Sequence, residues 1–333
     1  MTRTRRPWVI GHRGASGYRP EHTRAAYELA IALGADAVEP DIVATRDGVL
    51  VLRHENEISG TTDVADRPEF ADRRTTKQFA GVTATGWFTE DFTWDELRTL
   101  RAVERLPEQR PGSATFDGRY PLMRLEDLLE LIATTPTRTG RPLGLVAEIK
   151  HAAYFDAIGL PLGELVAEAL AGFGGPLVVE SFEETVLGEV RARGLRARYV
   201  YLLEGTGTAP DLALRLGAAA PDYTSQLSDA GLADLATRVD GVSVDKGRLL
   251  KPDVRAGVEL VDRAHRAGLE VYTWTLRPEN RFLTAPFRSG GGAREWGDWR
   301  GEFEAVLATG VDGVFADHPD LALAARDEVG GAT

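Results

Sequence analysis

The 333-residue chain contains no cysteine. This absence excludes a thiolate nucleophile, a disulfide framework and a thiolate zinc site. No apolar run approaches the roughly 20 residues that a membrane-spanning helix needs, so we expect no integral membrane segment. The basic segment Met1–Pro7 has no apolar stretch behind it that would form a signal peptide. We therefore expect a cytoplasmic protein.

Basic residues are outnumbered, with 39 Lys and Arg against 51 Asp and Glu, and the formal net charge is −12. This balance argues against nonspecific binding of nucleic acid. We therefore expect a small-molecule partner and no nucleic acid. An anionic substrate would need a local positive site, built from a metal ion and a few Arg or Lys side chains. No pattern in the chain indicates an oligomeric state.

Short apolar strands alternate with helical patterns along the chain. The expected strands cover residues 8–11, 37–43, 143–149, 177–180, 197–202, 241–244, 270–274 and 313–315. The expected helices cover residues 23–33, 125–133, 162–172, 183–193, 210–216, 252–267, 299–309 and 319–327. This alternation predicts a parallel sheet with right-handed crossovers. Eight units favour one closed (β/α)₈ TIM barrel over residues 1–333, rather than an open doubly wound sheet.

Two segments interrupt the alternation. Residues 55–120 are polar and rich in Asp and Thr, and a Thr93-x-x-Glu96 capping box predicts one short helix over 95–100. The second segment, residues 278–297, contains a glycine run. Both follow strand ends that carry candidate site residues. They fit surface insertions or a cap that shapes a substrate pocket, and we predict that 55–120 caps the barrel mouth.

The first candidate site lies around a predicted hairpin. Asp47-Gly48 between two apolar runs predicts a two-residue turn. With that turn, Asp41 would lie opposite His54. Glu39 and Asp41 are two residues apart, so on a strand they share one face. The turn would therefore set a histidine beside two carboxylates.

The active site of a (β/α)₈ barrel lies at the carboxyl ends of its strands. The polar and aromatic residues at the predicted ends are His12, Arg13, Glu39, Asp41, Glu148, Lys150, Glu180, Ser181, Asp245, Lys246, Trp274 and Asp317. The carboxylates Glu39, Asp41 and Glu148 come without a Cys or His cluster. Such a set suggests Mg²⁺ or Ca²⁺ rather than zinc.

The remaining candidates suggest phosphate chemistry. Arg13 and Lys150 would stabilise an anion, most simply a phosphate. His12 and His54 would act as acid and base on opposite sides of it. Trp274 is a candidate substrate contact. A structural alternative stays open for each, such as an ion pair of Arg13 with Glu39 or of Glu148 with Lys150. Together they describe phosphoester cleavage better than glycoside cleavage, which needs only two carboxyls.

Ten short phrases resemble the glycerophosphodiester phosphodiesterases, and in particular their larger bacterial branch. They are Gly11-His-Arg-Gly14, Pro20-Glu-His-Thr23, Gly34-Ala-Asp36, Glu39-Pro-Asp41, Thr45-Arg-Asp-Gly48, His54-Glu55, Glu148-Ile-Lys150, Glu180-Ser-Phe182, the run from Tyr272 to Asn280, and the run from Asp312 to Pro319. The resemblance implies a TIM barrel that hydrolyses glycerophosphodiesters to glycerol 3-phosphate and an alcohol.

The resemblance also implies roles for individual residues. Glu39, Asp41 and Glu148 would bind a divalent cation, Ca²⁺ or Mg²⁺. His12 would be the general acid and His54 the general base. The cations that hold the phosphate would be Arg13 and Lys150.

The chain departs from the family pattern at two positions, with His22 where Asn is usual and Glu55 where Asp is usual. Either change alters a contact behind the metal ligands or the acid–base groups. Three other functions stay open. They are a lysophospholipase D or sphingomyelinase D-like phosphodiesterase on the same barrel, a binding protein on an inactive barrel, and a glycosidase that uses a carboxylate pair.

Overall fold

The computed structural model describes residues 6–79, 81–137 and 140–331, so residues 1–5 of the basic N-terminal segment lie outside the described residues. Its strands are β1 Trp8–His12, β2 Ala37–Glu39, β3 Asp41–Ala44, β4 Leu50–Leu52, β5 Thr75–Phe79, β6 Val82–Gly86, β7 Gly144–Ile149, β8 Leu177–Ser181, β9 Arg198–Leu203, β10 Gly241–Asp245, β11 Glu270–Leu276 and β12 Gly313–Ala316.

The α-helices are α1 Arg24–Leu33, α2 Trp94–Leu97, α3 Pro111–Ala114, α4 Leu125–Thr134, α5 Ala152–Ala157, α6 Leu162–Leu170, α7 Glu184–Ala192, α8 Pro210–Leu216, α9 Tyr223–Gln226, α10 Asp229–Leu235, α11 Gly247–Leu250, α12 Val254–Ala267, α13 Trp299–Ala308 and α14 Pro319–Gly331. Short 3₁₀ helices cover Val64–Asp66, Pro68–Arg73, Thr89–Asp91, Gly217–Ala219 and Ala285–Phe287. No helix in the described ranges is both long enough and apolar enough to cross a bilayer.

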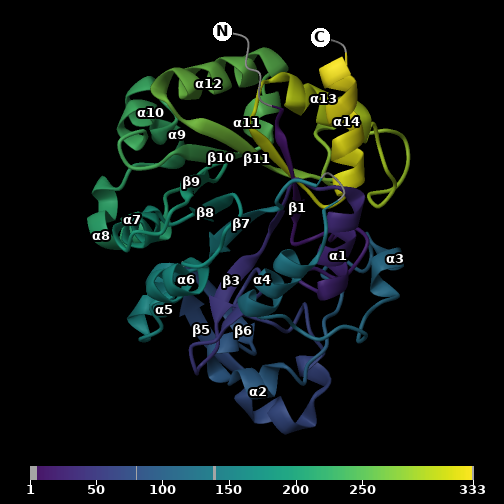
Figure 1. Ribbon diagram of the computed structural model, residues 1–333, viewed down its shortest axis with the longest axis vertical. Helices are drawn as coiled ribbons and strands as arrows, with labels where there is room; N and C mark the ends of the chain where they lie inside the picture. The colour runs from purple at the N-terminus through teal and green to yellow at the C-terminus, as the bar shows by residue number, and fades with distance from the viewer. Residues whose placement is uncertain (1–5, 80, 138–139, 332–333) are drawn as a thin grey trace.

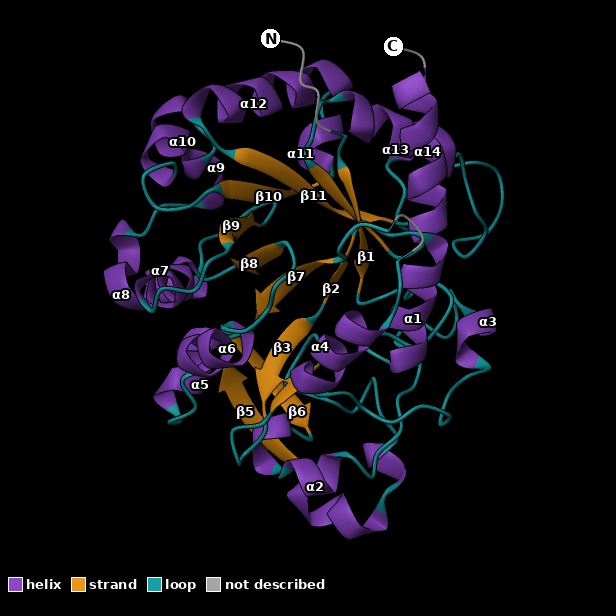
Figure 2. Cartoon of the chain, in the orientation of Figure 1, coloured by secondary structure: helices purple, strands orange, loops and turns teal. Residues whose placement is uncertain are grey.

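The strands close into a parallel barrel surrounded by helices (Figures 1 and 2). The hydrogen-bonded order runs β2-β1-β12-β11-β10-β9-β8-β7, and pairing of β2 with β7 closes the ring. Every predicted strand and every predicted helix is present, with ends that differ by a few residues. The predicted (β/α)₈ barrel is therefore confirmed.

Local signals explain several of these boundaries. Thr23 caps α1, where its side chain accepts a hydrogen bond from the Ala26 N–H. Gly34 ends the same helix in the left-handed conformation, with φ of 99°, and Gly268 ends α12 in the same way. Both glycines stand just before a strand, so they turn the chain from the outer helix layer back into the barrel.

The second barrel strand is split at Pro40, which has no N–H to donate to the ladder. Before it, β2 pairs with β1 and β7, and after it β3 pairs with β7 and β4. The Pro40 carbonyl still accepts a hydrogen bond from the Glu148 N–H, at 3.0 Å. The ladder therefore continues across the break, with Asp41 opposite Glu148.

The predicted hairpin register is wrong by one residue. Ile42 lies opposite Leu52, and the Arg53 N–H donates to the Asp41 carbonyl, so Arg53 and not His54 faces Asp41. A two-residue type I′ turn needs positive φ at both central residues, but within this turn only Gly48 has it, with φ of 78°. The result is a three-residue loop, which shifts the register by one. His54 consequently lies in the loop that follows β4.

The insertion 55–120 contains more regular structure than the sequence indicates. A hairpin of β5 and β6 was not predicted, because its exposed Thr and Gln side chains hide the alternating pattern of a strand. Figure 1 shows β5, β6 and α2 together in its lower part. The predicted helix is present as α2, and the Glu96 carboxylate accepts from the Thr93 N–H at 2.9 Å, as in a capping box.

The barrel interior is a packed core rather than a pore. Seven strands each contribute one buried side chain to it, and these are Ile10, Ala37, Val146, Val178, Val200, Tyr272 and Phe315. A larger apolar cluster fills the space between the sheet and the outer helices. The filled barrel therefore forms a rigid floor beneath the carboxyl ends of the strands.

A stability prediction follows from Gly14, in the loop after β1. Gly14 has φ of 85°, and a Cβ there would lie 2.5 Å from the Ala26 carbonyl carbon. Gly48 also has positive φ, but a Cβ there would meet nothing within 4 Å. Gly14→Ala should therefore lower the free energy of unfolding by at least about 3 kcal/mol, and Gly48→Ala by about 1–2 kcal/mol.

Urea denaturation of the two variants measures both values. Because Gly48→Ala carries the conformational cost without the clash, the difference between the variants reports how tightly α1 packs on the loop after β1. Equal losses would show that this loop can shift away from α1.

Candidate active site

A cavity of about 960 Å³ opens at the carboxyl ends of the barrel strands. Seven of the eight site residues predicted from the sequence line it: His12, Arg13, Glu39, His54, Glu148, Lys150 and Trp274. The eighth, Asp41, is fully buried. The fold therefore gathers residues from the first, second, third and seventh barrel strands around one space.

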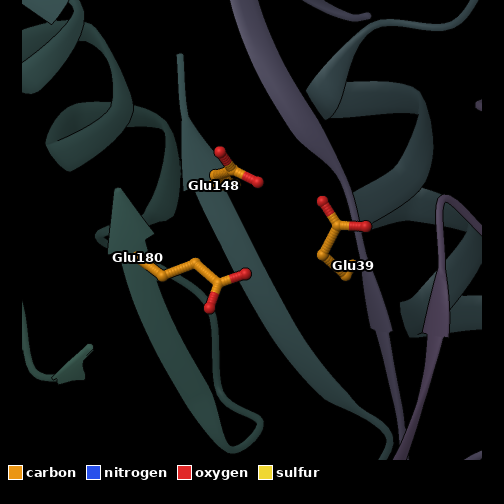
Figure 3. A group of neighbouring side chains, drawn as sticks. All are labelled: Glu39, Glu148 and Glu180. Carbon is orange, nitrogen blue, oxygen red and sulfur yellow. The ribbon is translucent and has the colours of Figure 1, made fainter. Parts of the chain in front are cut away.

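Three carboxylates converge at one wall of this cavity. Glu39, Glu148 and Glu180 end β2, β7 and β8, and each offers an oxygen within 4.8 Å of the others. Figure 3 shows their carboxylate groups facing a common space. The oxygens Glu39 Oε1 and Glu180 Oε2 are buried and have no hydrogen-bond partner in the described part of the chain. Buried carboxylates with unpaired oxygens fit a hard divalent cation, so this cluster can hold one.

This cluster differs from the predicted ligand set by including Glu180 and leaving out Asp41. The carboxylate of Asp41 instead contacts three cationic or polar neighbours. Its Oδ2 lies 2.9 Å from Arg13 Nε and 2.9 Å from His22 Nε2, and its Oδ1 lies 3.4 Å from Lys150 Nζ. Oδ1 still has no hydrogen-bond partner among the described residues. Asp41 therefore keeps one oxygen available to a cation.

Burial and mutual repulsion set the charge state of the carboxylates. Burial raises the pKa of Glu148 to about 8, although Lys150 acts in the opposite direction. Burial, with Asp41 nearby, raises the pKa of Glu39 well above its usual range. Burial acts on Asp41 too, but Lys150 and Arg13 hold the pKa of Asp41 well below its usual range. The raised pKa values mean that these carboxyls hold their protons more tightly than exposed carboxyls do, and a bound cation would compete with those protons.

Arg13 and Lys150 are two of the buried cations that line the cavity. Lys150 Nζ donates to Glu148 at 2.7 Å, so the ion pair that the sequence analysis left open between these two residues is present. The Arg13 guanidinium pairs with Glu21 at 2.9 Å and with Asp41, while its backbone N–H donates to Glu39 Oε2. Both cations also line the cavity. Their ion pairs hold them in place beside the space where an anion would bind.

His12 is held by a carboxylate from the last strand. Its Nδ1 lies 2.6 Å from Asp317 Oδ1. An ionised carboxylate can only accept, so Nδ1 carries the proton and Nε2 is the nitrogen left for chemistry. Burial, with a further contribution from Arg13, lowers the pKa of His12 to about 4. His12 is therefore a neutral imidazole at pH 7 when no anion is bound.

His54 is also held by a carboxylate at its Nδ1. Its Nδ1 bonds to the Glu55 carboxylate. Burial, and then Arg13 and Lys150, lower the pKa of His54 to about 3. The neutral imidazole presents an unprotonated Nε2, which is the form that a general base requires.

Trp274 lies near the carboxyl end of β11, beside the cavity. Its ring makes an edge contact with Phe182, with 5.6 Å between the ring centroids. The indole Nε1–H is buried and has no hydrogen-bond partner in the described ranges. A buried indole usually finds a partner, so this N–H is a donor that a substrate oxygen could use.

Sequence reasoning missed most of the residues that hold the predicted ones. Asp317 was visible as one of many strand ends and as part of the run from Asp312 to Pro319, but it was not predicted to hold His12. Arg105 and Arg110 contact the site through their side chains but carry no local pattern that marks them, and Glu21 stands in a family-like phrase but was given no role. His151 was not among the predicted site residues, yet it lines the cavity.

A sequence model described as the Glycerophosphoryl diester phosphodiesterase family matches residues 12–321. The chain is 31% identical to glycerophosphodiester phosphodiesterase GDPD6 of Arabidopsis thaliana, over 94% of this chain and 84% of that protein. It is 26% identical to the glycerophosphodiester phosphodiesterase of Haemophilus influenzae, over 94% of this chain and 87% of that protein.

A solved structure shares the fold. A phosphodiesterase of Oleispira antarctica, in complex with the product sn-glycerol-3-phosphate, matches with a TM-score of 0.64 and 20% identity. The match covers 97% of both chains. At this identity the likeness speaks for the barrel architecture alone.

The raised carboxyl pKa values predict how a cation stabilises the protein. The pKa of the Glu148 carboxyl is 4.5 in the unfolded chain and about 8 in the folded protein. The protonated carboxyl therefore contributes its full stabilisation of the fold below pH 4.5, and this stabilisation is lost as the pH rises through 8. A cation binds the deprotonated form and restores the lost stability. Mg²⁺ or Ca²⁺ should therefore raise the unfolding temperature more near pH 8 than near about pH 5.5.

Thermal unfolding with added cation or with EDTA measures this gain. Glu148→Gln should lose part of the pH difference, because its amide does not ionise, whereas Glu39 and Glu180 keep their raised pKa values. Glu164→Gln, at a half-exposed position on α6, is the matched control and should behave like the wild type. A gain of equal size at both pH values would contradict a cation at the cluster.

Proposed function

Because this chain belongs to the glycerophosphoryl diester phosphodiesterase family, we propose that it hydrolyses glycerophosphodiesters to glycerol 3-phosphate and an alcohol with a divalent cation. The observation that carries the proposal is the cavity in which a carboxylate cluster, two cations and two histidines meet. A related barrel binds sn-glycerol-3-phosphate as its product, which supports the same product here.

Oxygen ligands from the strand ends would hold the cation. The proposed set is Glu39, Asp41 and Glu148, as the resemblance implies, and the unpaired oxygen of Glu180 adds a fourth carboxylate. Ca²⁺ and Mg²⁺ both accept such ligands. When bound, the cation supplies positive charge that stabilises the phosphoryl oxygens and the attacking oxygen.

The two histidines would move protons on opposite sides of the phosphorus. His54 Nε2 takes the proton of the glycerol 2-hydroxyl as that oxygen attacks, and His12 gives a proton to the leaving alkoxide. The alcohol departs and leaves a cyclic phosphate on glycerol. A water that loses its proton to His12 then opens the ring, and His54 returns a proton to the 2-oxygen.

Arg13 and Lys150 would bind the phosphate. The charge that builds on the phosphoryl oxygens lies next to two buried cations, where the low dielectric strengthens the attraction. The anionic phosphate in turn favours the protonated form of His12, which the first step requires. Trp274 would donate its unpaired indole N–H to a substrate oxygen.

The insertion 55–120 would cap the mouth of the cavity. Its residues Phe79, Val82 and Ala84, from the β5–β6 hairpin, and Leu106 line the cavity with apolar side chains. This apolar lining is the observation that favours the alternative substrate class, in which a lysophospholipase D or sphingomyelinase D-like enzyme accepts a lipid tail.

A coupled assay for glycerol 3-phosphate tests the proposal, and an assay for the released alcohol reports cleavage of lysolipids, whose phosphate product keeps its acyl chain. The panel contains water-soluble glycerophosphodiesters and lysolipids, each with EDTA, Mg²⁺ or Ca²⁺. Release of glycerol 3-phosphate that EDTA abolishes supports the proposal, and the better metal identifies the cation. Cleavage of lysolipids alone would favour the alternative, and no cleavage with any metal would favour an inactive barrel. The predicted cytoplasmic location stays a prediction, which fractionation of the host cell checks.

Removal of the proposed base should abolish most turnover. His54→Ala is expected to lower kcat at least about 100-fold while leaving the unfolding temperature within a few degrees of the wild type. The matched control is His265→Ala on α12, whose ring contacts Asp312 away from the cavity. Steady-state kinetics with the best diester of the panel measures both variants. Turnover near the wild-type rate in His54→Ala would remove His54 from the mechanism.

A further inference from the structure

Two arginines of the insertion reach the carboxylates that hold His12 and His54. Arg105 and Arg110 stand five positions apart in a segment that belongs to no barrel unit. Arg105 binds the carboxylate next to His54, and Arg110 binds the carboxylate next to His12. The same short segment therefore contacts the surroundings of both proposed acid–base groups.

The Arg105 guanidinium makes two pairs of hydrogen bonds, one pair to each of two carboxylates. Its Nη1 and Nη2 donate to the two oxygens of Glu55 at 3.0 and 2.8 Å. Its Nε and Nη2 donate to the two oxygens of Glu21 at 2.8 and 2.6 Å. Glu21 in turn accepts from Arg13 at 2.9 Å. One guanidinium therefore fixes the partner of His54 and the partner of the phosphate-binding Arg13.

The contacts of Arg110 are more deeply buried. Its side chain is 6% exposed, and its Nη2 donates to Asp317 Oδ2 at 2.5 Å. Arg277 Nε donates to the same oxygen at 2.7 Å, which leaves Oδ1 for His12. Arg110 also donates to Glu279 at 2.8 Å and to the Ser16 carbonyl at 3.2 Å.

These contacts matter because a carboxylate orients an imidazole only when the carboxylate itself is held. A guanidinium presents its donors in a rigid planar fork, which fixes the plane of a carboxylate. The fixed carboxylate then holds Nδ1–H and turns Nε2 to the reacting atoms. Without the fork, Glu55 is free to rotate toward water, since its side chain is 32% exposed.

We propose that Arg105 and Arg110 are positioning residues, which fix His54 through Glu55 and His12 through Asp317, so that the insertion completes the acid–base machinery from outside the barrel. The inference rests on the proposed function, because it concerns the rate of that reaction. It goes beyond a cap that only shapes the pocket.

A purely structural role is the rival explanation, because both arginines also tie the insertion to the barrel. The two roles differ in what they change. Anchoring affects folding and the shape of the pocket, so its loss changes the unfolding temperature and KM. Positioning affects kcat and the orientation of the imidazoles.

The first experiment compares Arg105→Ala and Arg110→Ala with Arg98→Ala in the full-length enzyme. Arg98 is an exposed arginine of the same insertion that pairs with Asp95. Each of the first two variants should lose about 10–100-fold in kcat with little change in KM, and Arg98→Ala should match the wild type. Wild-type kcat in folded Arg105→Ala and Arg110→Ala would overturn the proposal.

Added guanidinium chloride at low concentration separates the two roles further. A guanidinium ion can occupy the space that the deleted side chain leaves, so it should restore part of kcat in both alanine variants and none in His54→Ala. Arg105→Lys and Arg110→Lys keep the charge without the fork and should have intermediate kcat. If all these variants lose kcat, regain none of it with guanidinium and have a lower unfolding temperature, the role is anchoring alone.

Long-range ¹H–¹⁵N NMR spectra of the histidine rings give a readout that does not depend on activity. In the wild type, His12 and His54 should both be in the Nδ1–H form. The lysine variants should lose this single form at the histidine that each arginine serves, and keep it at the other. An unchanged ring form at both histidines would overturn the proposal. If the wild type cleaves no diester, the proposed function fails, yet these spectra still decide whether the arginines position the rings.

Discussion

The burial of four carboxylates at one end of the barrel is the constraint on which the site depends. Moving a charge from water into a protein costs several kcal/mol unless partners offset it. The buried cations Arg13 and Lys150 offset part of this charge, and Asp41 is the carboxylate that they hold ionised. The three carboxylates that face the common space keep raised pKa values and two unpaired oxygens. The charge balance is therefore complete only with protons or a divalent cation.

The strand register creates this concentration of charge. Near their carboxyl ends β3, β7 and β8 pair so that Asp41 lies opposite Glu148 and Glu148 opposite Glu180. The histidines stand at the edge of the acidic cluster, and carboxylates outside it hold them. Arg105 and Arg110 balance those outer carboxylates. The site thus consists of an inner layer open to a cation and an outer layer of ion pairs that keeps the side chains in position.

The sequence predicted the barrel well, because strands and helices carry their own periodicity and caps. Thr23 and Gly34 mark the two ends of α1 in the sequence and in the structure alike. The hairpin register was wrong because Asp-Gly suits two different turns, and contacts outside the turn select one of them. Here the Asp47 carboxylate accepts from the Trp94 N–H at the start of α2, which lies far along the chain. The β5–β6 hairpin was missed because its side chains are mostly exposed and polar.

By itself, the sequence determined the eight barrel units and the residues at their carboxyl ends. The tertiary structure decided that Glu180 joins Glu39 and Glu148, that Asp41 turns to Arg13 and Lys150, and that the insertion reaches behind both histidines. The physical reason is the range of the interactions. Propensity, capping and periodicity act within a few residues, whereas hydrogen bonds between side chains depend on strand register and barrel closure, which join residues hundreds of positions apart.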